Sequence, residues 1–208
     1  MSARRASAAR GAPADRRRTA AVAGHRGDEA TARAHLEDRD GSVRATALGA
    51  LARMGRLRPA DLDRALASAD ASLRRRAAEL AAAVPGVPLV PLLADSDPMV
   101  VEVAAWALGE REQADPDVVA ALAGVATGHD DPMCREAAVA ALGAIGDPAG
   151  LAAILVATRD KPAIRRRAVL ALAPFSGPEV DEALARAAQD RDWQVRQAAE
   201  DVSGNPPT

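Results

Sequence analysis

The chain has 208 residues, 49% of them hydrophobic and only 1% aromatic, which is enough apolar material for a substantial core. The abundance of alanine and the near absence of aromatic residues argue against a β-sandwich or barrel and favour closely packed helices. A net charge of −2 argues against a protein that binds nucleic acid over its whole surface. The sequence contains no apolar run of 18 residues that would predict a membrane span.

Without a recognisable signal peptide, we expect a soluble, cytoplasmic protein. Cys134 is the only cysteine, and it occupies a position where other parts of the chain carry valine, leucine or isoleucine. We therefore interpret it as a buried thiol in a reducing compartment. One lysine against 26 arginines is typical of a GC-rich bacterial gene.

Residues 1–13 lack an apolar stripe, so we expect a disordered basic tail. Residues 1–26 contain seven arginines and one acidic residue, which leaves the remaining residues with a net charge of −8. A solvated tail is the first interpretation. The alternative is contact with an anionic partner, although the absence of an aromatic residue disfavours nucleic acid. The arginines available for such contact are Arg4, Arg5, Arg10, Arg16, Arg17 and Arg18.

Helical periodicity and capping signals predict about thirteen helices, in six pairs followed by a single helix. Two prolines, Pro88 and Pro91, predict irregular geometry in the sixth of them. The predicted helices cover residues 16–23, 29–37, 42–54, 60–68, 72–84, 87–94, 98–110, 116–127, two helices within 131–159, 162–174, 178–188 and 193–202.

A short phrase recurs six times, with Lys161 replacing the acid in one copy and Val101 replacing the arginine in another: an acidic residue, then an apolar residue three positions later, then arginine and alanine. The apolar positions 43, 73, 100, 134, 164 and 195 are 30, 27, 34, 30 and 31 residues apart. A period in the range of roughly 20–50 residues is typical of solenoids. We therefore predict an all-α, right-handed α-solenoid of about six and a half helix–turn–helix repeats over residues 14–204, with a short C-terminal tail at 205–208.

The repeats resemble short HEAT repeats of the PBS-lyase HEAT-like kind, in which "DxDxxVRxxAAxALG…GDPxAxxxLxxAL" recurs. Residues 92–110, 128–147 and 189–199 carry this pattern best. We expect each repeated aspartate to cap its own helix, where it can also meet an arginine of an adjacent repeat, and the resemblance implies the same ladder. The ladder residues are Asp40, Arg44, Asp70, Arg74, Asp97, Asp131, Arg135, Arg165, Asp192 and Arg196, with interruptions at Val101 and Lys161.

By analogy with the family, the second helices of the repeats line a concave binding face. Charged residues of these helices are the candidates for contact with a partner, namely Asp61, Arg64, Asp117, Glu179, Glu182 and Arg186. We therefore expect a monomeric, non-catalytic scaffold that binds another protein and carries no cofactor.

Enzymatic alternatives remain open. Deoxyhypusine hydroxylases resemble HEAT proteins but hold two irons with His-Glu pairs, and this chain has no His-Glu dipeptide and no HExxH or CxxC motif. An alkylpurine DNA glycosylase would need aromatic residues in a basic cleft, but the only tryptophans, Trp106 and Trp193, are interpreted as packing and as cover for a capping turn. A lyase or chaperone of the phycobilin-lyase type is the third alternative.

Overall fold

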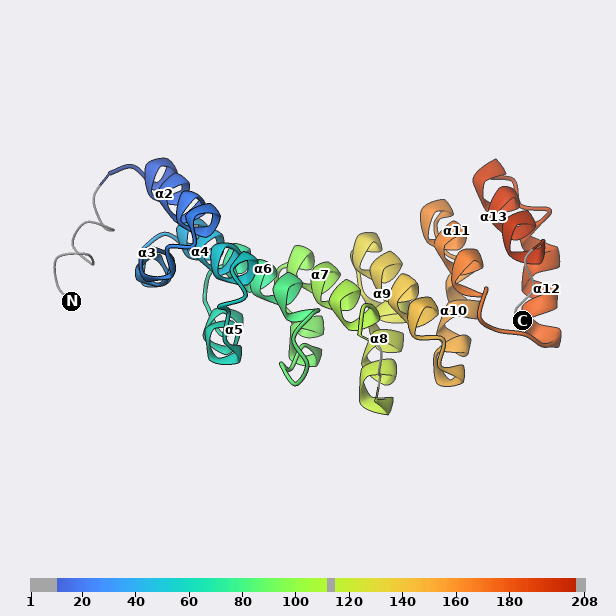
Figure 1. Ribbon diagram of the computed structural model, residues 1–208. Helices are drawn as coiled ribbons and strands as arrows, with labels where there is room; N and C mark the ends of the chain where they lie inside the picture. Colours follow the sequence, from blue (N-terminus) through green and yellow to red (C-terminus); the bar gives the residue numbers. More distant parts are fainter. Residues whose placement is uncertain (1–10, 112–114, 205–208) are drawn as a thin grey trace. The chain divides into compact units, whose positions relative to one another are not determined.

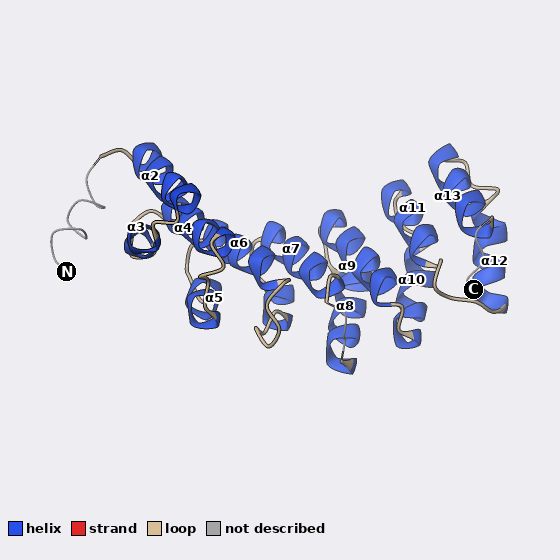
Figure 2. Cartoon of the chain, viewed as in Figure 1, coloured by secondary structure: helices blue, strands red, loops and turns tan. Residues whose placement is uncertain are grey.

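The computed structural model describes residues 11–111 and 115–204. Within these ranges every regular element is helical (Figure 2). The predicted C-terminal tail and most of the predicted N-terminal tail lie outside the described residues. Two compact units make up the chain, residues 1–88 and 89–208, and the predicted repeat domain at 14–204 extends over both.

Unit 1 contains two rows of helices. The first helices of the repeats lie side by side in one row and the second helices form the other (Figure 1). The first row is α2 (Pro13–Arg26), α4 (Gly41–Arg53) and α6 (Ala71–Ala81), and the second row is α3 (Glu29–His35) and α5 (Pro59–Leu66).

The first helix of unit 1 is longer than the predicted 16–23. It begins at Pro13, whose missing N–H needs no partner at a helix start, and ends at Gly27 in the left-handed conformation with φ 71°. Both signals are local, and they extend the helix beyond the predicted bounds at each end.

Unit 2 repeats the two-row arrangement (Figure 1). Of the helix predicted at 87–94, only residues 90–94 are helical, as a 3-10 helix, consistent with the prolines there. The first row is α7 (Pro98–Gly109), α9 (Pro132–Ile145), α11 (Pro162–Ala171) and α13 (Trp193–Ser203); the second is η1 (Val90–Ala94), α8 (Pro116–Gly128), α10 (Leu151–Ala157) and α12 (Pro178–Ala187), with η2 (Pro148–Gly150) leading into α10. Each unit is thus built as an α-solenoid.

The alanine-rich composition allows first-row helices to approach closely. A Cβ added to Gly143 of α9 would lie 2.6 Å from the Cβ of Ala171 in α11, and one added to Gly109 of α7 would lie 2.9 Å from the Cα of Ala141 in α9. Gly24 of α2 meets Ala50 of α4 in the same way. Only glycine fits where two backbones approach this closely.

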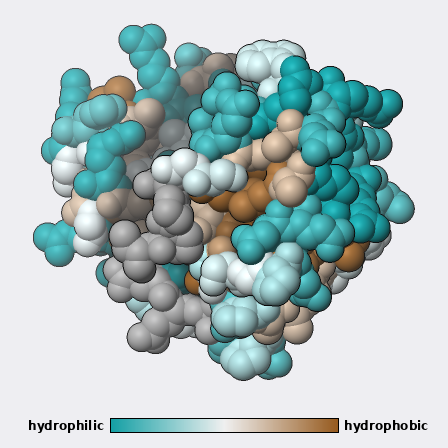
Figure 3. Space-filling model, turned by 90° about the vertical axis from the view of Figure 1, so that its right-hand side faces the viewer, coloured by the Kyte–Doolittle hydropathy of each residue, from teal (hydrophilic) through white to brown (hydrophobic). Residues whose placement is uncertain are grey.

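The last repeat of unit 2 buries its apolar side chains between three helices. Val169 of α11, Ala187 of α12 and Val195 of α13 form one cluster that also includes Ala198 and Ala199. Figure 3 views the molecule from the side of α12 and α13, where hydrophilic residues surround a smaller apolar area near the centre. Burying such stripes against neighbours, rather than in one central core, is how a solenoid is stabilised.

Candidate functional site

The repeated aspartates lie at the first-row helix starts, where each one accepts a hydrogen bond from a backbone N–H two or three residues further on. Donor–acceptor distances are 2.8 to 3.2 Å. The capping residues are Asp40, Asp70, Asp97, Asp131 and Asp192. These side chains satisfy backbone donors that a helix start otherwise leaves without a partner, so their carboxylates serve the fold.

The repeated arginines bind the turn that precedes their own helix. In each case Nη1 donates to a backbone carbonyl oxygen five or six residues earlier, at 2.8 or 2.9 Å. The five arginines are Arg44, Arg74, Arg135, Arg165 and Arg196. Each guanidinium therefore fixes the loop between the second helix of one repeat and the first helix of the next.

In two links of unit 2 the acid that joins one repeat to the next lies one or two residues before the capping position. Arg135 donates to both carboxylate oxygens of Asp160, at 2.7 and 3.0 Å, and Arg165 does the same to Asp190, at 2.8 and 2.7 Å. At Arg165 the neighbouring capping aspartate, Asp192, already accepts from the N–H of Gln194 in its own helix. The earlier aspartates have free lone pairs for the fork of an arginine.

These two ion pairs are mostly shielded from solvent, and the pKa values of their aspartates are shifted. The Arg165 and Asp190 side chains are 10% and 16% exposed. The hydrogen bond from Arg165 lowers the pKa of Asp190 in spite of burial, and the hydrogen bond from Arg135 lowers the pKa of Asp160 in the same way. Both carboxylates are therefore held ionised as structural groups.

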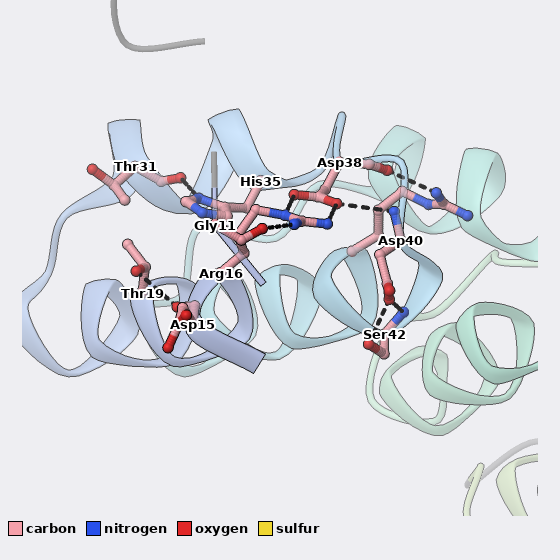
Figure 4. A network of polar contacts seen from close by, with 10 residues as sticks. Gly11, Asp15, Arg16, Thr19, Thr31, His35, Asp38, Asp40 and Ser42 are labelled. Carbon is pink, nitrogen blue, oxygen red and sulfur yellow. Dashed lines mark hydrogen bonds and ion pairs between the residues drawn. The ribbon is translucent and has the colours of Figure 1, made fainter. Parts of the chain in front are cut away.

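Arg16 belongs to this network and not to a basic arm. It is buried and donates through Nε and Nη2 to Asp38 at 2.8 and 3.0 Å, while Nη1 donates to the carbonyl oxygen of Gly11 at 2.6 Å (Figure 4). Burial opposes ionisation of Asp38, but the hydrogen bonds from Arg16 and from the Asp40 N–H lower its pKa overall. Arg16 cannot contact an external anion, which corrects the prediction for this residue.

The other arginines of the predicted arm divide into two groups. Arg17 and Arg18 are exposed on α2. Arg4, Arg5 and Arg10 lie outside the described residues. The structure therefore places two of the six candidate cations where an anionic partner could reach them.

Two of the predicted partner-binding residues, Asp61 and Arg64, lie in unit 1 and are engaged within it. Asp61 accepts from Arg33 Nη1 and from the N–H of Arg58, both at 3.1 Å, and Arg64 pairs with Glu37 at 2.9 Å. Asp61 is thus a structural residue, with a side chain only 12% exposed. Both residues line a cavity of about 330 Å³.

The second-row candidates of unit 2 come together between α10 and α12. Glu179, Glu182 and Arg186 line a cavity of about 500 Å³ opposite Leu155, Val156 and Arg159, and we call these six residues the α10–α12 groove. Arg186 lies 3.4 Å from both Glu182 and the hydroxyl oxygen of Thr158. Val156 is 58% exposed, which is unusual for a valine on a packed helix. Asp117 is exposed at the start of α8, outside this groove.

Both tryptophans are exposed, and this contradicts the interpretation of Trp106 as a packed residue. Trp106 is 45% and Trp193 65% exposed. The buried face of α7 consists of Val100, Val101 and neighbouring alanines with Leu108, so Trp106 lies on the opposite side. Its neighbours Ala105 and Ala107 are equally small, and for that reason the sequence did not indicate which side was buried.

Two of the histidines, His35 and His129, make local hydrogen-bond contacts. Nδ1 of the buried His35 lies 2.8 Å from the carbonyl oxygen of Thr31, and Nδ1 of His129 accepts from the N–H of Asp131 at 3.0 Å. Across residues 11–111 and 115–204, no three His, Cys, Asp or Glu side chains gather as a metal site requires. In the same ranges, none of the helices is both long and apolar enough to cross a bilayer.

Solved structures with the same fold include engineered and natural repeat proteins. An engineered protein aligns with a TM-score of 0.63 at 22% identity, covering 86% of this chain and 98% of its own. A designed armadillo repeat protein in complex with the peptide (KR)4 aligns with a TM-score of 0.51 at 16% identity, over 92% and 91% of the two chains. Human deoxyhypusine hydroxylase aligns with a TM-score of 0.50 at 18% identity, over 90% and 77%.

No curated protein matches the sequence. The structural likenesses are all below 25% identity and therefore establish the fold alone. Residues 87–173 match the family of HEAT repeats, and they include the repeats of unit 2 in which the Arg135–Asp160 pair links neighbours. From the repeated helix pairs, the family match and the shared architecture it follows that residues 87–173 carry HEAT repeats within an α-solenoid fold.

Proposed function

We propose that the protein is a non-catalytic scaffold that binds another protein through the α10–α12 groove of unit 2. The observation that carries this proposal is the exposed Val156 beside four charged side chains in an open cavity of about 500 Å³. An apolar centre with a polar rim is the usual anatomy of a protein–protein interface.

The walls of the groove are fixed before a partner arrives. Ile154 of α10 and Val180 and Ala183 of α12 are buried beneath it, with at most 2% of their surface exposed. A preorganised surface loses little conformational freedom on binding, which favours affinity without chemical change. The designed armadillo protein of similar fold was solved in complex with the peptide (KR)4, which supports peptide binding by a fold of this architecture.

The charges of the groove indicate what it would accept. Glu179, Glu182, Arg159 and Arg186 are exposed, so both signs are present around Val156. We expect the partner to place an apolar side chain on Val156 and complementary charges around it. Such charges select a partner and its register more than they add affinity.

Photo-crosslinking tests this proposal. A photoreactive amino acid at Val156 should capture one protein species from the native lysate, and the same residue at Ala163, exposed at the start of α11, should not. Changing Glu182 to lysine should reduce the yield at Val156 by at least fivefold. Equal yields at both positions would refute a binding role for the groove. A captured molecule that is chemically altered by the chain would favour the enzymatic alternative.

A further inference from the structure

The first-row face of unit 2 carries a second hollow, between α7 and α9. Trp106 and Met133 line this cavity of about 460 Å³, and they are 45% and 57% exposed. Small residues form half of the remaining lining: Gly109, Ala137, Ala140, Ala141 and Ala144. We call this hollow the Trp106 groove. Large exposed apolar side chains beside a recess mark an interaction site more often than a chance feature of the surface.

The rim of the Trp106 groove is acidic. Glu102 lies four residues before Trp106 on α7, and Glu110 lies four residues after it, at the C-cap of that helix, so all three side chains line the same side of the groove. Glu136 of α9 is the third acid, and its partner is the single cation of the groove, Arg167, at 3.6 Å. No ion pair joins Glu102 or Glu110 to another described residue.

The charge of the whole unit has the same sign. Residues 89–208 contain 19 acidic and 10 basic residues, a net charge of −9, whereas residues 1–88 contain 10 acidic and 17 basic residues, a net charge of +7. The near-neutral total of −2 conceals this contrast. A field of this sign attracts cationic segments to unit 2 and repels phosphate-rich partners.

We propose that the Trp106 groove binds a basic segment of a partner protein, with an arginine or lysine side chain against the indole of Trp106 and its cation between Glu102 and Glu110. The stem of such a side chain is apolar and its tip is charged, which matches an aromatic face flanked by two carboxylates. An apolar neighbour in the same segment covers Met133. This groove is on the opposite row from the α10–α12 groove, so the two proposals stand or fall separately.

Peptide binding to the full-length chain tests the proposal. The probes are the fluorescein-labelled peptide (Gly-Arg-Leu-Ser)3 and its counterpart (Gly-Glu-Leu-Ser)3, measured by anisotropy at 50 and 500 mM NaCl. We expect saturable binding of the arginine peptide, at least tenfold tighter than the glutamate peptide at low salt and weaker at high salt. Equal affinity for the two peptides, or no saturable binding up to 1 mM, would overturn the proposal.

Three variants locate the site. Trp106→Ala should weaken binding of the arginine peptide about tenfold, and the isosteric pair Glu102→Gln and Glu110→Gln should weaken it at least fivefold and reduce its salt dependence. Trp193→Ala is the matched control, because Trp193 is more exposed and lies on α13, and its affinity should stay within twofold of wild type. Loss of affinity in the control but not in Trp106→Ala would place binding elsewhere and overturn the assignment.

A further full-length variant tests whether the chain supplies its own basic segment. Replacing Arg4, Arg5 and Arg10 with serine removes the three cations of residues 1–10. Unchanged peptide affinity supports an external partner. Affinity that rises more than fivefold would show that these residues already occupy the groove, and would overturn the assignment to a partner protein.

Discussion

The link between the last two repeats offers the sharpest test of how this solenoid is held together. Asp190 accepts three hydrogen bonds: from Arg165 Nε at 2.8 Å, from Arg165 Nη2 at 2.7 Å and from the N–H of Asp192 at 2.8 Å. It therefore ties α11 to the turn that starts α13. Asp190→Asn keeps the shape but removes the charge and turns an amide NH₂ group toward an arginine donor.

The expected cost follows from these contacts. The asparagine oxygen can keep the bonds from Arg165 Nη2 and from Asp192, so one charge-assisted hydrogen bond is lost, worth about 1.5–3 kcal/mol. Breaking a fully buried ion pair costs about 3–5 kcal/mol, and this pair is 10% and 16% exposed. We expect Asp190→Asn to lower the free energy of unfolding by about 2–3 kcal/mol.

Urea denaturation at pH 7 measures this cost. Both tryptophans, Trp106 and Trp193, belong to unit 2, so their fluorescence reports the unfolding of that unit. Glu182→Gln is the control, because its ion pair with Arg186 is 3.4 Å long and 41% and 77% exposed, and should contribute less than about 0.5 kcal/mol. If Asp190→Asn shifted the transition no more than this control, the Arg165–Asp190 pair would not be what joins these repeats.

Three further predictions rest on other contacts. The Arg135 hydrogen bond lowers the pKa of Asp160 in the folded protein. The stability that this pair contributes is therefore full above the pKa of about 3.9 of an unfolded aspartate, and it is lost as the pH falls through the pKa of the folded state. Stability measured during an acid titration should fall less steeply for Asp160→Asn than for wild type. Gly143→Ala should cost about 1–3 kcal/mol because its Cβ would overlap Ala171, whereas Gly124→Ala, with nothing within 4 Å, should stabilise by about 0.5–1 kcal/mol; thermal melts that ranked them the other way would contradict the close approach of α9 and α11. Burial raises the pKa of Cys134 to about 11, so a disulfide reagent at pH 7.5 should label it only after denaturant is added, and rapid labelling of the native chain would show that α9 is not packed as described.

Local signals were sufficient to predict the secondary structure and the repeat. Aspartate followed by proline marks the starts of α7 and α9, because one supplies a cap and the other a preset backbone angle. The prolines near η1 likewise predicted an irregular segment. Such features depend only on residues a few positions apart, so the sequence alone is enough to predict them. The regular spacing of the capping turns then indicates a stack of repeats.

The partners of side chains across repeats required the tertiary structure. The sequence shows that Asp190 and Asp192 occupy one turn, but only the packing of α11 against α13 decides that the first meets Arg165 while the second caps its own helix. The sequence placed Arg16 in a basic arm because it shows the charge of this residue but not its contact with Asp38, which lies 22 residues away. Trp106 became a surface residue because the neighbouring helix fixes which side of α7 is buried. Local geometry determines where a helix begins, whereas the arrangement of neighbouring helices determines what each of its faces meets.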